Sequence, residues 1–82
     1  MANVKKELEE MAEVISIEIA REQNSIEYYT KAHKKAVSES AKRLFASLIE
    51  QEKGHEVKLR ASLRELKAEI ELERLKRKEH KA

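Results

Sequence analysis

Val37-Ser38-Glu39-Ser40 is the one stretch that interrupts a chain otherwise patterned as helix. Ser38 suits a helix N-cap because its hydroxyl can accept a hydrogen bond from an unpaired backbone N–H of the first turn. Glu39 adds a negative charge at the positive end of the helix dipole that would follow. The stretch therefore predicts a short turn between two helices.

Both arms of this turn carry apolar or small residues at alternating steps of three and four, the pattern of a packed helix. The positions are Val4, Leu8, Met11, Ile15, Ser25, Tyr29, Ala32 and Ala36, then Ala41, Phe45, Leu48, Leu59, Ser62 and Leu66. We expect helices at about 3–36 and about 39–76, packed as an antiparallel hairpin. Each arm would leave an apolar stripe uncovered, so the hairpin should dimerise into a four-helix bundle.

The composition agrees with an all-α fold in a single domain spanning residues 1–82. The chain has 82 residues, 41% of them charged and 4% aromatic, with one Gly and no Pro. Strands and tight turns need the β-branched, aromatic, Gly and Pro residues that are scarce here. A helical chain this short usually needs a metal, disulfides or oligomerisation for stability. Cysteine is absent, which excludes disulfides and thiolate metal sites.

Partner classes are also limited by the sequence. A formal net charge of +2 does not by itself indicate nucleic-acid binding. No apolar run approaches the roughly 18 residues of a membrane span, and no stretch resembles a signal peptide. We therefore expect a cytoplasmic chain without a nucleic-acid or membrane partner. A basic tail at 74–82 could contact an acidic surface, or its cations could serve only the helix C-terminal dipole.

The informative residues are those that interrupt the apolar stripes. The first stripe continues from Ile15 to Glu18 and Glu22, and the second continues from Leu48 to Glu52 and His55. Carboxylates at core positions cost several kcal/mol each, on the order expected for buried charges, unless they are paired or metal-bound. A turn centred near residue 37 or 38 brings Glu22 level with residue 53. Glu22, Glu52 and His55 should therefore share one layer and form a metal site.

Two copies of the chain would supply four Glu and two His, a complete ligand set for two metal ions. This donor set suits Fe or Mn, and two divalent ions would offset the four negative charges. The segment from Glu22 to Tyr29 resembles the first-helix signature of the rubrerythrin and ferritin-like superfamily, and the segment Leu44–His55 resembles its Glu-x-x-His signature. A chain carrying this unit once is similar to the encapsulated ferritins, whose two-helix subunits complete the site by dimerisation.

The resemblance implies a di-iron ferroxidase, which oxidises Fe(II) with dioxygen for iron storage. It also implies a ring-shaped homo-oligomer, carried as cargo inside an encapsulin shell. Acidic residues that flank the first ligand in some relatives are replaced by Arg21 and Asn24, and no shell-targeting sequence is recognisable at 74–82. Tyr29 matches a family tyrosine that acts beside the metal centre, although a half-buried core tyrosine explains it equally well.

Four further residues lie near these stripes or at the end of the chain. Glu18 is either an additional ligand or a carboxylate at the rim of the site. His33 lies off the main stripe and is expected at the surface or an interface, and His80 lies in the tail. Gly54 either permits close helix approach beside the metal or is merely tolerated. Two alternative functions stay open: a rubrerythrin-like peroxide reductase, and a non-enzymatic helical assembly whose polar layer sets register.

Overall fold

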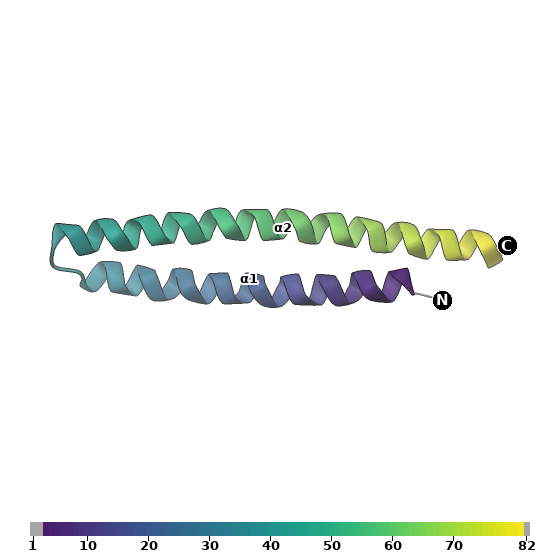
Figure 1. Ribbon diagram of the computed structural model, residues 1–82, viewed down its shortest axis with the longest axis horizontal. Helices are drawn as coiled ribbons and strands as arrows, with labels where there is room; N and C mark the ends of the chain where they lie inside the picture. The colour runs from purple at the N-terminus through teal and green to yellow at the C-terminus, as the bar shows by residue number, and fades with distance from the viewer. Residues whose placement is uncertain (1–2, 82) are drawn as a thin grey trace.

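The computed structural model describes residues 3–81, with side chains through residue 77. It contains two helices, α1 (Val4–Lys35) and α2 (Glu39–Lys81), which pack side by side as an antiparallel hairpin (Figure 1). The hairpin is an elongated rod of 66 × 16 × 15 Å. The predicted all-α class and hairpin arrangement are thereby confirmed.

Both helices begin at side-chain caps. Asn3 Oδ1 accepts a hydrogen bond of 3.0 Å from the backbone N–H of Lys6 at the start of α1. Ser38 Oγ accepts one of 3.1 Å from the backbone N–H of Ala41 at the start of α2. The N-cap role predicted for Ser38 is therefore confirmed, and it fixes where the chain reverses.

The second helix is longer than the sequence pattern indicated, since it runs past residue 76 to Lys81. Ion pairs one turn apart precede this extension: Arg74 pairs with Glu71, and Lys76 pairs with Glu73. Arg77 also reaches across the hairpin and donates to Asn3 Oδ1 at 3.1 Å. The expected tail is thus the end of α2, where it projects beyond the start of α1 (Figure 1). The side chains of residues 78–82, including His80, lie outside the described part.

The hairpin by itself has a small core. Among the described residues, Ile19 and Leu66 are the buried apolar side chains, and the other apolar side chains are half-buried or exposed. Val4 and Met11, which we expected on the packed stripe, are 47% and 46% exposed. Their exposure is consistent with the expectation that a single hairpin leaves part of each apolar stripe uncovered. Ile19, which lies beside the α1 stripe, is instead buried against α2.

The uncovered surface is large for a chain of this size. A compact monomer of 9.6 kDa exposes about 5,100 Å², whereas the hairpin exposes 6614 Å². The excess of about 1,500 Å² exceeds the roughly 800 Å² that each partner buries in a standard protein interface. Within residues 3–81, neither helix is both long and apolar enough to cross a membrane.

Candidate metal centre

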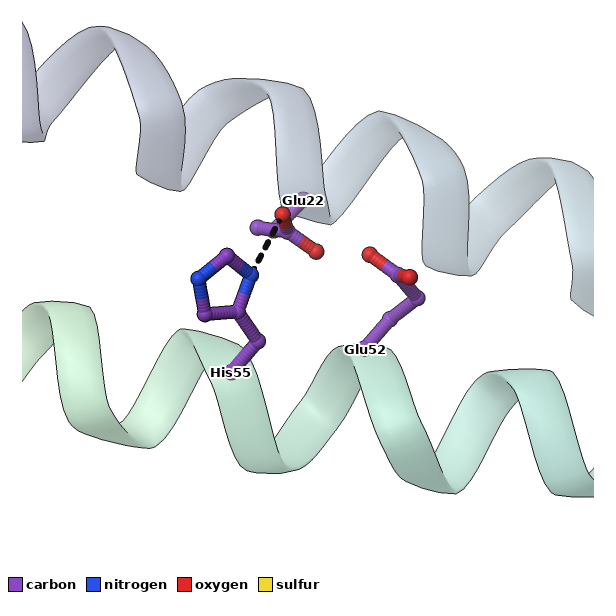
Figure 2. Close-up of side chains that lie close together, drawn as sticks. All are labelled: Glu22, Glu52 and His55. Atoms are coloured by element: carbon purple, nitrogen blue, oxygen red, sulfur yellow. Dashed lines mark hydrogen bonds and ion pairs between the residues drawn. The ribbon is translucent and has the colours of Figure 1, made fainter.

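Glu22 of α1 and Glu52 and His55 of α2 converge between the two helices, as the sequence predicted (Figure 2). One ligand atom from each side chain lies within 4.8 Å of the other two. The convergence follows from the hairpin register, because the turn at 36–38 brings residue 22 level with the middle of the Glu-x-x-His segment. The i, i+3 spacing then places Glu52 and His55 on one face of α2.

Glu22 is the buried member of the group, with 9% of its surface exposed. Its Oε1 lies 2.8 Å from Nδ1 of His55 on the opposite helix. Its Oε2 is buried and has no hydrogen-bond partner in the described structure. A buried carboxylate oxygen without a partner is costly, since it has lost water and gained nothing in exchange.

The side chains of the group point toward one another, and the carboxylates of Glu22 and Glu52 face each other (Figure 2). Two facing carboxylates repel unless a cation lies between them. Carboxylate oxygens and an imidazole nitrogen are the donors that Fe and Mn accept. The orphaned oxygen and the donor set therefore fit a divalent metal ion.

Exposure increases across the group, which places it at one side of the hairpin. Glu22 is buried, Glu52 is half-buried, and the His55 side chain is 54% exposed. A metal ion held here by one copy would have protein ligands on one side only. The group therefore has the form of a half-site that a second surface would complete.

A second polar bridge joins the helices beside this group, and the sequence analysis did not anticipate it. Gln23 Nε2 donates to Glu56 Oε2 over 3.4 Å, and Arg60 Nε donates to the same oxygen over 2.8 Å. Gln23 directly follows Glu22 in the sequence, and Glu56 directly follows His55. In the sequence, the i, i+4 spacing of Glu56 and Arg60 indicates that these two side chains can pair on one face of the helix.

Tyr29 lies away from the Glu22 group, two helical turns further along α1. Its ring is half-buried and stacks on Phe45, with centroids 6.4 Å apart. It also meets Tyr28 edge to face at 5.7 Å. The structure thus gives Tyr29 a packing role between the helices and leaves its proposed role at the metal centre a prediction.

The remaining candidates occupy less central positions. Glu18 is outside the three-residue group and pairs with Arg21 at 2.8 Å, which suits a carboxylate at the rim. His33 is half-buried, and its expected place at a surface or interface stays a prediction. A methyl group added at Gly54 would meet no atom within 4 Å, so the hairpin itself does not require glycine there.

A Glu on one helix facing Glu-x-x-His on the next is the half-unit of ferritin-like di-metal proteins. The chain matches the family Rubrerythrin over residues 1–63. This match covers more than half of the sequence, and the chain belongs to the rubrerythrin family, a family of ferritin-like di-iron proteins. No curated protein and no solved structure gives a significant match.

Proposed function

We propose that the protein is a ferroxidase whose di-iron site is completed when two copies of the chain pair. Each copy would contribute Glu22, Glu52 and His55. The observation that supports this most directly is the buried, unpartnered Oε2 of Glu22 beside the carboxylate of Glu52. The hydrophobic effect alone gives no reason to bury that oxygen, whereas a metal ligand must face its ion.

The charge balance supports two copies and two ions. One copy offers two carboxylates and a neutral imidazole, so a pair of copies brings four negative charges into one layer. Two divalent ions cancel those four charges. The uncovered surface beside the exposed His55 provides room for the second copy.

In this proposal the chain's own residues bind the iron, orient the ligand side chains and exclude water from the site. Glu22 and Glu52 would hold the iron through their carboxylate oxygens, whose negative charge would offset that of the metal. The hydrogen bond between Glu22 and His55 holds both side chains in place before metal arrives. Ile19, one turn from Glu22, is 6% exposed and excludes water from that side. Ferrous iron, when bound, supplies the electrons that reduce dioxygen, and the ferric product leaves for storage.

The separation of 30 residues between Glu22 and Glu52 supports a closer assignment, to the encapsulated-ferritin type. On that reading the dimers assemble into a ring, and the ring is cytoplasmic cargo of an encapsulin shell, where oxidised iron accumulates. Manganese is the other metal that the donor set suits.

The test combines metal content with oxidation. Native mass spectrometry and elemental analysis of protein reconstituted with Fe(II) should give two iron atoms for each pair of chains. Stopped-flow absorbance under air should then show rapid formation of ferric iron, with oxygen consumed. Protein that binds no stoichiometric metal would instead support the non-enzymatic assembly with a polar layer.

The family match favours one further function, a peroxide reductase of the rubrerythrin type. Such an enzyme would turn over hydrogen peroxide with electrons from an added reductant. Peroxide turnover much faster than ferric mineral formation would select this function over iron storage.

A further inference from the structure

We propose that two surface patches of opposite charge on α1 come together in an antiparallel pair of hairpins. Each patch contains a shallow hollow, and the two lie on opposite sides of Glu22 along the helix. The inference rests on the proposed two-copy metal site, whose layer it uses as the centre of the pair. In this pair the acidic patch of one copy contacts the basic patch of the other.

The first hollow has an acidic rim and an apolar floor. It is an open groove of about 340 Å³ near the start of α1, lined by Glu7, Glu10, Met11, Val14 and Ile15. Met11 and Val14 are 46% and 59% exposed, so the groove presents apolar surface to solvent. Within the described part of the chain, Glu7 and Glu10 take part in no ion pair. The groove lacks a partner within the hairpin.

The second hollow has a basic rim and lies toward the turn. It has a volume of about 240 Å³ and is lined by Tyr28, Lys31, Ala32 and Lys35. Tyr28 is 69% exposed and offers a large apolar ring. Lys31 pairs with Glu27 at 3.1 Å, whereas Lys35 makes no ion pair with any residue that the structure describes. This hollow too has unsatisfied apolar and charged surface.

The two hollows lie at matching distances from the metal layer. Met11 precedes Glu22 by eleven residues and Ala32 follows it by ten, which is about 16 Å and about 15 Å along the helix. A two-fold axis through the metal layer, perpendicular to the helices, therefore brings the acidic groove of one copy level with the basic hollow of the other. The same operation repeats the contact at the opposite end.

The charges of the two patches favour antiparallel pairing of the hairpins over parallel pairing. If two copies paired in parallel about the same layer, Glu10 would be level with Glu10 and Lys35 with Lys35. Like charges at close range weaken such an interface. In the antiparallel pair Glu10 is level with Lys35, and both contacts are attractive. The partner of the groove is accordingly the turn end of a second copy.

A charge-swap experiment tests the pairing. Glu10→Lys and Lys35→Glu should each weaken self-association about tenfold, because each places like charges at both ends of the pair. An equimolar mixture of the two variants should form mixed dimers in preference to either homodimer, and Glu10→Lys/Lys35→Glu in one chain should restore homodimers. Native mass spectrometry of mass-labelled chains measures the amounts of homodimer and mixed dimer in each sample. Glu50→Lys, an exposed change outside both hollows, is the matched control. Equal self-association of wild type, both single variants and their mixture would overturn the inference.

Cross-linking gives an independent reading, since the chain has no native cysteine. Met11→Cys and Ala32→Cys chains, mixed and oxidised, should yield the 11–32 disulfide. In the antiparallel pair two copies of residue 11 are about 33 Å apart, too far for a disulfide, which needs Cα atoms within about 7 Å. A dominant 11–11 product would overturn the inference.

Both experiments are run in chelator and in Mn(II), and neither depends on the oxidation of iron. Paired hollows without oxygen consumption by the iron-loaded protein would refute the ferroxidase and leave this interface standing. Iron oxidation with no response to the charge swap would refute the interface alone.

Discussion

Glu22 and His55 bond each other across the hairpin, with 2.8 Å between Oε1 and Nδ1. When the Glu22 carboxylate is ionised it only accepts hydrogen bonds, so Nδ1 of His55 must then carry the proton and donate in this contact. The second oxygen of Glu22 is buried and has no hydrogen-bond partner among the residues that the structure describes. One side chain therefore anchors the histidine and at the same time presents a free ligand atom toward Glu52.

We expect this layer to be essential for iron oxidation and dispensable for the fold. Glu22→Ala, Glu52→Ala and His55→Ala should each abolish Fe(II)-dependent oxygen consumption, because two-fold symmetry removes both copies of the ligand. Helix content should persist, since apolar contacts above and below the layer remain. Stopped-flow absorbance and circular dichroism on the same samples measure both properties.

Glu50→Ala is the control for these substitutions, because Glu50 is exposed and outside the metal group. It should oxidise iron at close to the wild-type rate. Wild-type rates in helical Glu52→Ala or His55→Ala protein would rule out the assignment of the site.

Glu22→Leu should raise the stability of the metal-free protein while abolishing metal binding. Leucine removes a buried charge and an unpartnered oxygen, which we expect to increase the free energy of unfolding by about 1–3 kcal/mol. At fixed chain concentration in chelator, the midpoint of thermal unfolding should rise by several degrees. A lower midpoint would show that the bond to His55 outweighs the cost of burying Glu22.

Tyr29 should act mainly through its ring. Tyr29→Phe keeps the stack on Phe45 and should leave both the melting temperature and the initial iron-oxidation rate within about twofold of wild type. Tyr29→Ala removes the stack, and because the ring is only half-buried we expect a cost of about 1–3 kcal/mol of stability. A tenfold slower oxidation by well-folded Tyr29→Phe would instead assign the hydroxyl a part in the reaction.

Gly54→Ala distinguishes the two readings of that glycine. An added methyl group meets open space in the hairpin, and alanine is favoured over glycine within a helix by about 1 kcal/mol. Thermal unfolding in chelator should therefore shift upward. If the substitution blocks formation of the iron-loaded dimer while stabilising the free chain, Gly54 serves close approach of the second copy.

The turn and the convergence of Glu22, Glu52 and His55 were predictable, because the capping signal is local and the turn position sets which residues of the two helices lie level. Ser38 caps a helix wherever it sits before one, and polar residues at Glu22, Glu52 and His55 break stripes of known period. The rotation of α1 about its own axis was not predictable, since it depends on how two surfaces pack. For that reason Ile19 emerged as buried and Met11 as exposed. The bond between Gln23 and Glu56 depends on the same rotation.

Metal should drive assembly of the chain. Without metal, pairing brings four carboxylates together in one layer, and their repulsion weakens the dimer. A divalent ion that binds only the paired form stabilises it by about 2.7 kcal/mol at one hundred times its dissociation constant. Sedimentation velocity at low chain concentration should show mainly single hairpins in chelator, and dimers or larger rings with Mn(II) or anaerobic Fe(II). Glu52→Ala should not respond to metal, whereas Glu50→Ala should respond as wild type does. The same distribution of species in chelator and in metal would refute this coupling.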